Sequence, residues 1–200
     1  MDKLVIASNN PGKLREFERM LAPLGIEVLT QAQLGISEAD EPHCTFVENA
    51  LAKARHVSRA SGLPALADDS GICVDALGGA PGVISARYAG DSPKSDQRNT
   101  EKLLHEMQGI SARQAHYYCV LVLVRHADDP QPLIAEGEWH GEIAHEARGD
   151  DGFGYDPYFW LADYGKTAAE LPHEEKAKVS HRAVALGKLL ARLTDRLPNS

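Results

Sequence analysis

Short apolar runs alternate with helical spacings of apolar residues along the whole chain. The apolar runs have the length of β-strands and predict strands over residues 4–8, 27–30, 65–67, 72–74, 115–125, 133–143 and 157–161. Apolar residues spaced three or four apart predict four helices, which cover about 14–24, 45–61, 96–107 and 180–197. Because strands and helices are mixed from end to end, the sequence predicts an α/β protein.

Two of the predicted strands, 115–125 and 133–143, follow each other without a helix between them. We therefore expect an antiparallel hairpin joined around residues 127–132 and a mixed sheet rather than a purely parallel one. The length of 200 residues suits one domain that covers 1–200 and buries a sizeable core.

Two of the predicted helices carry capping signals at their N-termini. Thr45 is followed three residues later by Glu48, which is the capping-box pattern, and Gly62 and Pro64 end that helix. Ser180 is placed to cap the last helix.

Composition and charge exclude several classes of protein. The formal net charge is -8, so a non-specific duplex-DNA binder, which needs a basic face, is disfavoured. No apolar stretch approaches the ~20 residues of a membrane span, and the chain enters a strand directly after Met-Asp-Lys, without a signal-peptide pattern. We expect a cytoplasmic protein with no nucleic acid and no membrane as partners.

The cysteines and histidines show no metal-binding spacing. Cys44, Cys73 and Cys119 contain no CxxC pair, and the nine histidines contain no HxxxH or HExxH. We therefore predict reduced thiols and no zinc site.

The opening turn, Ser8-Asn9-Asn10-Pro11-Gly12-Lys13, joins a predicted strand to a predicted helix. The N-terminus of a helix offers unpaired N–H groups and the positive end of the helix dipole, which together attract anions. Gly12 allows close approach of a ligand, and Lys13 adds a cation. The sequence is equally compatible with a plain turn, because Asn, Pro and Gly are common turn residues.

Two acidic segments are candidate metal sites. Asp68 and Asp69 come where an apolar strand is expected to end and turn through Ser70, and two adjacent carboxylates need an offsetting charge such as Mg²⁺. The alternative is a solvated turn. Asp40 and Glu41 precede the capped helix, where a solvated loop is the alternative.

Two later segments are candidates for binding a base and phosphates. In residues 149–157 glycines and acids enclose Phe153, Tyr155 and Asp156, so an aromatic ring could stack on a base, or it could simply enter the core. Lys176, His181 and Arg182 bring cations to the last helix, where a surface set is the alternative.

Eight motifs, taken in order, resemble one family. They are residues 8–13, 45–50, 67–71, 77–82, 85–88, 152–157, 165–170 and 180–182. Together they resemble the noncanonical purine nucleoside triphosphate pyrophosphatases, also called inosine triphosphate pyrophosphatases. The resemblance covers nearly the whole chain.

The resemblance implies hydrolysis of dITP, ITP or XTP to the monophosphate and pyrophosphate with Mg²⁺, which keeps deaminated purines out of DNA and RNA. It implies an elongated mixed β-sheet flanked by helices, in two lobes with the active site in the cleft between them, and a homodimer. His181 and Arg182 would then be donors to the O6 atom of a 6-oxo purine, which adenine lacks.

The same resemblance assigns roles by position. Asp69 is expected as the general base and a metal ligand, with Asp68 beside it as the alternative base. Glu41 is expected as the second metal ligand, with Asp40 as the alternative. The residues expected to bind substrate are Ser8, Asn9, Asn10, Pro11, Gly12, Lys13, Lys53, Ser70, Phe153, Gly154, Tyr155, Asp156, Lys176, His181 and Arg182.

Two other functions use the same residues. One is a pyrophosphatase that acts on a modified pyrimidine or an ordinary nucleotide. The other is a non-catalytic nucleotide-binding module, for which Asp69 would be dispensable and from which no pyrophosphate would form.

Overall fold

A mixed seven-stranded β-sheet runs through the part of the chain that the computed structural model describes, residues 1–150, 152 and 154–194. The strands are β1 (Lys3–Ile6), β2 (Glu27–Thr30), β3 (Ala65–Val74), β4 (Gln114–Val124), β5 (Leu133–Ile143), β6 (Phe159–Leu161) and β7 (Lys166–Thr167). Their order in the sheet is β2-β1-β3-β4-β5-β6-β7. Strand β1 is parallel to β2 and β3, whereas β6 is antiparallel to β5 and β7. The predicted α/β class with a mixed sheet is confirmed.

The main helices are α1 (Pro11–Leu21), α2 (Phe46–Ser61), α3 (Asp96–Glu106), α4 (His173–Val179) and α5 (His181–Thr194). The predicted last helix therefore begins where expected, while its final positions, 195–197, lie outside the described residues. Helix α4 was not predicted. None of the helices in the described ranges has the length and apolarity that a membrane crossing requires.

The chain divides into two compact units. Unit 1 consists of residues 1–69, 119–136 and 185–200, and unit 2 consists of residues 70–118 and 137–184. The boundaries fall inside strands β3, β4 and β5 and helix α5, so these four elements contribute residues to both units. Each unit contains its own cluster of buried apolar side chains.

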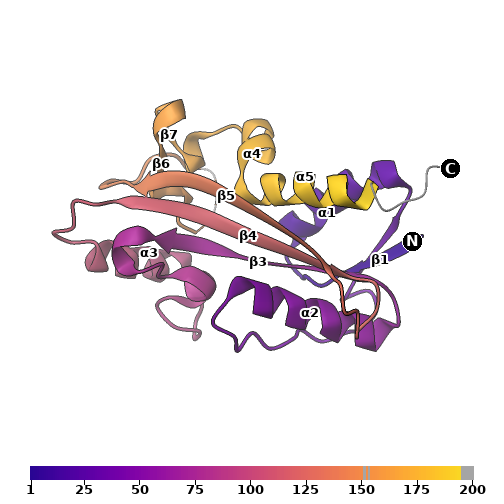
Figure 1. Ribbon diagram of the computed structural model, residues 1–200. Coiled ribbons are helices and arrows are strands. Elements are labelled where there is room, and N and C mark those ends of the chain that lie inside the picture. The colour runs from indigo at the N-terminus through magenta and orange to yellow at the C-terminus, as the bar shows by residue number, and fades with distance from the viewer. Residues whose placement is uncertain (151, 153, 195–200) are drawn as a thin grey trace. The chain divides into compact units, whose positions relative to one another are not determined.

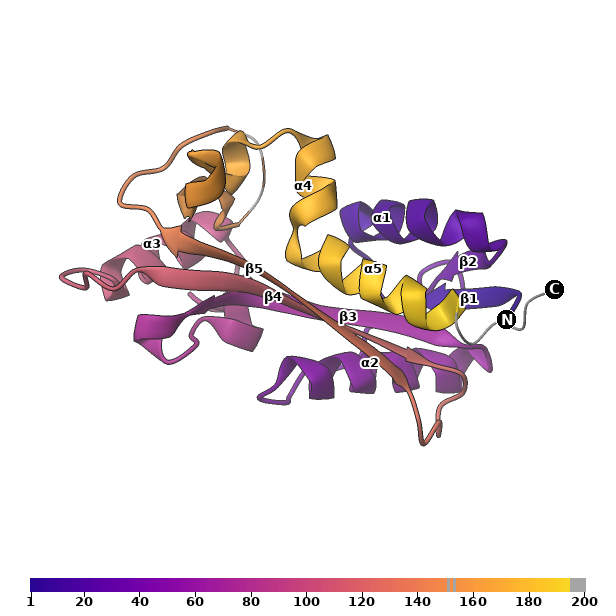
Figure 2. The same ribbon diagram turned by 45° about the horizontal axis from the view of Figure 1, so that its top comes forward.

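The core of unit 1 is formed by helices packed on its strands. Figures 1 and 2 show α1 and residues 185–194 of α5 on one face of these strands and α2 on the opposite face. Phe17 of α1, Leu121 of β4, and Leu186 and Leu189 of α5 are all fully buried in one cluster. Such burial of large apolar side chains is the main source of stability for this unit.

Local capping explains where α1 and α2 begin. The Asn10 side chain caps α1, with Pro11 at the first helical position. Thr45 caps α2 by accepting from the Glu48 amide at 3.3 Å, and Gly62 ends that helix with φ of 69°. The predicted limits of the 45–61 helix are confirmed.

Two predicted features of the strands were wrong. Residues 65–67 and 72–74 belong to one continuous strand, β3, so the Asp-Asp-Ser-Gly sequence is not a turn. Remote side chains offset the charge of these acids, as described below, so the strand continues through them. Strand β6 begins at Phe159 rather than at Pro157, because residues 156–158 form a 3₁₀ turn. Proline has no N–H to donate to a strand pair.

The hairpin between β4 and β5 is confirmed. Ile143 at the end of β5 donates its amide to the carbonyl of Arg113 at 2.9 Å, directly before β4 begins, so the two strands run antiparallel. Asp129 in the connection is buried. Its carboxylate accepts from the Arg125 guanidinium and from the Gln131 amide, and the hydrogen bond from Arg125 is the main reason that the pKa of Asp129 lies well below its ordinary value.

The core of unit 2 is richer in aromatic side chains. Phe159 of β6 is fully buried, and its ring centroid lies 5.6 Å from that of Trp139 on β5. Leu103 and the adjoining Met107 pack from α3 into the same cluster, which also contains Tyr155. The candidate base-binding residues of unit 2, described below, lie in or beside this aromatic core.

The buried leucine of β4 gives a test of the unit 1 core. Leu121→Ala is expected to lower the free energy of unfolding by about 2–5 kcal/mol, because it removes buried apolar surface and leaves a cavity. Leu34 is 41% exposed in the same unit, so Leu34→Ala is the matched control and is expected to change stability by less than about 0.5 kcal/mol. Urea unfolding followed by circular dichroism measures both. Equal effects of the two substitutions would contradict the assignment of this core.

Candidate active site

The predicted anion-binding turn is tied down by one of its own side chains. Asn10 Oδ1 accepts hydrogen bonds from the amides of Gly12 at 2.9 Å and Lys13 at 3.2 Å. The expectation of unpaired N–H groups at these two positions was therefore wrong, because Asn10 caps them. The backbone amide of Asn10 donates to Ser8 Oγ at 3.2 Å, and the side-chain amide of Asn9 donates to Glu38 Oε1 at 2.8 Å. The turn is thus a preformed, hydrogen-bonded element at the start of α1.

The side chain of Lys13 extends from this turn to strand β3. Its Nζ lies 2.6 Å from Asp68 Oδ2, and only 1% of the Asp68 side chain is exposed. A buried carboxylate of this kind needs a partner charge, and Lys13 provides it. The cation that the sequence predicted for a phosphate is held in place by Asp68.

The second acid of β3 belongs to a separate cluster. Lys53 Nζ on α2 lies 3.5 Å from Asp69 Oδ1 and 2.7 Å from Glu41 Oε1. Asn49, one turn earlier on the same helix, is fully buried and donates to Asp69 Oδ2 at 3.3 Å. Two side chains of α2 therefore hold the Asp69 carboxylate from its two oxygens.

Neighbouring positions in a strand explain this separation. Successive side chains of a strand point to opposite faces of the sheet, so Asp68 reaches Lys13 of α1 while Asp69 reaches Lys53 of α2. The two helices lie on opposite faces of unit 1 in both views (Figures 1 and 2). Each carboxylate therefore has its own lysine partner, and the charge of the pair is offset from both faces of the strand.

Burial and neighbouring charges set the electrostatics of the Asp69 cluster. Burial, and then the negative charge of Glu41, outweigh the charge of Lys53 and raise the pKa of Asp69 above its ordinary value. Burial alone would lower the pKa of Lys53, but the carboxylates of Asp69, Asp68 and Glu41 outweigh it and raise that pKa. Lys53 therefore stays charged, while the Asp69 carboxylate is more basic than that of an ordinary aspartate.

Glu41 and Asp40, the two candidates for the second metal ligand, differ in their surroundings. Glu41 contacts Lys53 at 2.7 Å, whereas Asp40 is exposed to solvent. Asn49 also fixes the loop that carries them, because its side chain accepts from the His43 amide at 3.0 Å and donates to the His43 carbonyl at 3.2 Å. The sequence did not predict this link between the acidic loop and Asp69.

The carboxylates of this cluster suit a hard cation. In the described part of the chain, no three His, Cys, Asp or Glu residues are grouped so that they alone could hold a metal ion. Mg²⁺, however, is usually bound through one or two carboxylates together with waters and substrate phosphates. Glu41 and Asp69 both supply oxygen atoms, and the repulsion between them contributes to the raised pKa of Asp69. The donor set therefore fits a magnesium ion that arrives with a phosphate ligand.

Unit 2 contains a second site cluster around a buried aspartate. Asp156 is 3% exposed, and its Oδ2 lies 2.5 Å from Lys176 Nζ on α4. Its Oδ1 accepts from the Tyr117 hydroxyl at 3.1 Å. Gly152 lies against the same carboxylate, since a Cβ at that position would be 2.7 Å from Asp156 Oδ2. The glycine in the predicted base-binding segment is thus required by the packing of Asp156.

The other predicted residues of this segment have different environments. Tyr155 is buried in the unit 2 core and donates its hydroxyl to the Ser85 carbonyl at 2.8 Å. The Gly154 amide donates to Asp96 Oδ2 at 2.9 Å, and Phe153 lies outside the described residues. Ser70 is half-buried in β3, one position after Asp69.

The start of α5 brings the last predicted residues to the same unit. Ser180 accepts from the Ala183 amide at 3.3 Å, which confirms it as the cap. The imidazole of His181 stacks on the ring of Tyr117, with centroids 4.9 Å apart and planes 13° from parallel. Arg182 is 9% exposed. Sequence reasoning missed Tyr117, because nothing in the local pattern of β4 distinguishes it from a core aromatic.

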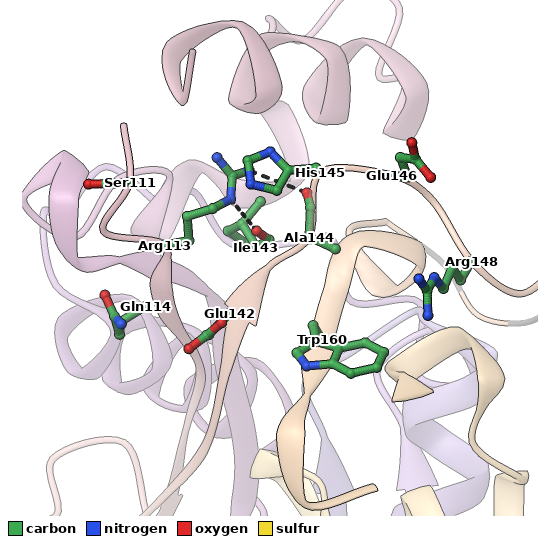
Figure 3. Close-up of a pocket in the computed structure, with 10 residues that line it drawn as sticks. All are labelled: Ser111, Arg113, Gln114, Glu142, Ile143, Ala144, His145, Glu146, Arg148 and Trp160. Carbon is green, nitrogen blue, oxygen red and sulfur yellow. Dashed lines mark hydrogen bonds between the residues drawn. The ribbon is translucent and has the colours of Figure 1, made fainter. Parts of the chain in front are cut away.

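A separate pocket of about 500 Å³ lies in unit 2 (Figure 3). It is lined by Ser111, Arg113, Gln114, Glu142, Ile143, Ala144, His145, Glu146, Arg148 and Trp160. Figure 3 shows the Arg113 guanidinium directed at the backbone carbonyls of Ile143 and Ala144, to which it donates. Arg113 therefore fastens the end of β5, and the described lining includes no residue predicted for the site.

The Lys53 contacts predict a pH-dependent loss of stability. Lys53→Met leaves buried carboxylates without their cation, so the free energy of unfolding should fall by about 3 kcal/mol near neutral pH. Loss of the lysine charge raises the pKa of Asp69 further, so the folded variant binds a proton more strongly than its unfolded chain. The variant is therefore expected to recover stability as pH falls, with a larger deficit at about pH 8 than at about pH 5.

Urea unfolding at the two pH values measures this difference. Arg59→Met is the matched control from the same helix, because Arg59 pairs with Asp128 at the surface, where the side chains are 63% and 87% exposed. That variant is expected to lose less than about 1 kcal/mol at either pH. A Lys53→Met deficit that does not change with pH would contradict the electrostatic role.

Curated relatives of known name align with almost the entire chain. A dITP/XTP pyrophosphatase from Nitrosomonas europaea is 65% identical over 195 residues, which cover 98% of this chain and 96% of that protein. A dITP/XTP pyrophosphatase from Ralstonia nicotianae is 66% identical over 195 residues, which cover 96% of this chain and 97% of that protein.

Solved structures with the same fold agree with these relatives. A HAM1 protein from Coxiella burnetii has a TM-score of 0.94 at 45% identity, with 98% of this chain and 100% of that chain covered. The Ham1 protein of Staphylococcus aureus has a TM-score of 0.88 at 38% identity, with 96% and 98% covered. The family model described as Ham1 family matches residues 4–192. Since this match spans nearly the whole sequence, the chain belongs to the Ham1 family.

Proposed function

We propose that this protein is a dITP/XTP pyrophosphatase, which hydrolyses dITP, ITP and XTP to the monophosphate and pyrophosphate. The observation that carries the proposal is the buried Asp69, held by Asn49 and Lys53 beside Glu41. The names and identities of the relatives support the substrate class. By removing these nucleotides, the enzyme would keep deaminated purines out of DNA and RNA.

The phosphates are assigned to the unit 1 cluster. Lys13 and Lys53 are its cations, and the capped turn of residues 8–13 presents Ser8, Asn9 and Asn10 side chains at the start of α1. A bound phosphate would share these lysines with Asp68 and Asp69, and the positive end of the α1 dipole favours an anion there. Ser70 follows Asp69 in β3 and is proposed as a further contact.

Mg²⁺ is the proposed cofactor, with Glu41 and Asp69 as its protein ligands and Asp40 as the alternative to Glu41. When bound, the ion would neutralise phosphate charge and stabilise the pyrophosphate leaving group. It would also offset the repulsion between the two carboxylates that helps to raise the pKa of Asp69.

Asp69 is the proposed general base. A water oxygen forms a bond to the α-phosphorus while the bond from that phosphorus to the bridging oxygen breaks, and pyrophosphate leaves with the bonding electrons. An Asp69 oxygen accepts the proton that the water loses. Asn49 donates to Asp69 Oδ2 at 3.3 Å, which orients the carboxylate for this step. Asp68 is already paired with Lys13 at 2.6 Å, so it is the weaker candidate for the base.

The purine base is assigned to the unit 2 cluster. His181 and Arg182 are the proposed donors to O6, and Asp156 holds Lys176 as a further cation. Adenine carries an amino group at this position, which would leave buried donors unpaired at a cost of roughly 1–3 kcal/mol for each. Phe153, Gly154 and Tyr155 belong to the same proposed segment.

We also propose that units 1 and 2 act together as one pyrophosphatase domain over residues 1–200, and that the protein works as a cytoplasmic homodimer that binds neither nucleic acid nor membranes. The net charge of -8 supports the absence of a nucleic-acid partner.

Pyrophosphate release tests the proposed function. Purified protein with Mg²⁺ is expected to turn over dITP and XTP at least about tenfold faster than dGTP and dATP at low substrate concentration. Asp69→Asn is expected to lower kcat by roughly 10²–10⁴-fold, because the general base is lost while the side chain keeps its size. Asp128→Asn, at a surface carboxylate that is 87% exposed, is the matched control and should retain full activity.

The other two candidate functions give different results. Equal turnover of all four purine nucleotides, or faster turnover of a modified pyrimidine, would keep the hydrolysis but refute the purine selection. Nucleotide binding by both the unaltered protein and Asp69→Asn, with no pyrophosphate from either, would identify a binding module instead.

A further inference from the structure

We propose that Tyr117 is the positioning residue for purine selection, because its ring holds the imidazole of His181 while its hydroxyl holds Asp156. This inference rests on the proposed function, in which both of those residues belong to the base site. Tyr117 itself is not assigned to contact the substrate.

The ring of Tyr117 is fixed by aromatic neighbours from the sheet. It lies in β4, and the ring of Phe159 from β6 meets it at 65°, with centroids 4.7 Å apart. Trp139 of β5 lies 6.4 Å from it, with the two planes 27° apart. Phe159 is fully buried and Trp139 is 7% exposed. These two side chains therefore form a rigid support for Tyr117.

The imidazole of His181 rests on this supported ring. The planes of Tyr117 and His181 are 13° from parallel, with centroids 4.9 Å apart, which is an offset-stacked arrangement. A histidine at the first position of a helix has two free side-chain torsions. Stacking on a fixed ring restricts both, so the plane in which the imidazole nitrogens lie is set by Tyr117.

The hydroxyl of Tyr117 connects the same residue to the aspartate. It donates to Asp156 Oδ1 at 3.1 Å, while Asp156 Oδ2 lies 2.5 Å from Lys176 Nζ. Burial, and then the charge of Asp156, hold the pKa of Tyr117 well above its ordinary value. The hydroxyl therefore remains protonated, and a hydrogen-bond donor, at neutral pH. One side chain thus fixes the position of His181 and, through Asp156, of Lys176.

The choice of a 6-oxo purine over adenine depends on the orientation of the His181 imidazole more than the affinity for the nucleotide does. A hydrogen bond weakens steeply once its donor angle falls below about 120°. An imidazole that rotates freely would still occupy the site, but its N–H would spend less time directed at O6. Loss of the stack is therefore expected to reduce the preference for a 6-oxo purine over adenine, not merely the overall rate.

Two substitutions separate the ring from the hydroxyl. Tyr117→Leu removes the stack, and we expect it to lower the ratio of kcat/KM for dITP to that for dATP by about 2- to 10-fold. Tyr117→Phe keeps the ring and removes only the hydroxyl, so its ratio should fall less than that of Tyr117→Leu. Tyr164→Phe is the control, because Tyr164 is an exposed tyrosine of the same unit, and its ratio should not change.

The outcomes distinguish the positioning role from simple core packing. If Tyr117→Leu lowers kcat/KM for dITP and dATP in parallel, so that the ratio is unchanged, the residue is structural and the proposal is overturned. If Tyr117→Phe loses as much selectivity as Tyr117→Leu, the hydroxyl carries the effect and the proposed role of the His181 stack is overturned. If the unaltered protein releases no pyrophosphate from any nucleotide, it is the proposed function that fails.

A spectroscopic measurement covers the case in which Tyr117→Leu does not fold. The ring current of Tyr117 should shift the imidazole proton resonances of His181 in the unaltered protein upfield of those of the exposed His126. The assignment uses His181→Gln, in which the shifted resonances disappear. Resonances of His181 at the position of an exposed histidine would show that no stack forms in solution and would overturn the proposal.

Discussion

The pairing of buried aspartates with lysines from helices is the interaction on which the rest of this structure depends. Asp68, Asp69 and Asp156 are each less than 7% exposed, and each lies within ion-pair distance of a lysine. An isolated carboxylate in such surroundings would cost far more than one strand pairing returns. Strand β3 can continue through two adjacent acids only because α1 and α2 bring a cation to each of its faces.

The two units use different physical means to hold their candidate groups. In unit 1 the groups are held by charge, since Lys53 contacts two carboxylates and Asn49 connects the acidic loop to Asp69. In unit 2 the carboxylate and lysine rest on an aromatic core, and Tyr117 contacts both the carboxylate and an imidazole. Charges are suited to phosphates and magnesium, whereas flat rings are suited to fixing the plane in which a base is recognised.

The sequence allowed prediction of those features that depend on local chemistry. The capping box at Thr45 defined α2, and two consecutive strand-length segments without a helix between them defined the β4–β5 hairpin. The path of β3 could not be predicted, because Asp-Asp-Ser-Gly has the composition of a turn and the lysines that neutralise it lie far away in the sequence. The amides at the start of α1 were also expected to be unpaired, although Asn10, a local residue of a preferred capping type, caps them.

The candidate site was predictable as a set of residue types but not as a set of contacts. Lys53, Glu41 and Asp69 were named from the family resemblance, and the structure brings these three together. Tyr117 was missed because its role depends on which side chains of β5, β6 and α5 meet its ring, and strand periodicity carries no information on that.

The opposite orientation of Asp68 and Asp69 also limits how this segment can vary between species. One residue inserted or deleted between Ala65 and Asp68 would turn each carboxylate toward the wrong helix and leave two lysines and two acids mismatched. Differences in length are tolerated far better in exposed connections, such as residues 90–94 before α3. A chain that keeps both ion pairs is therefore expected to keep the same number of residues from Ala65 to Asp69.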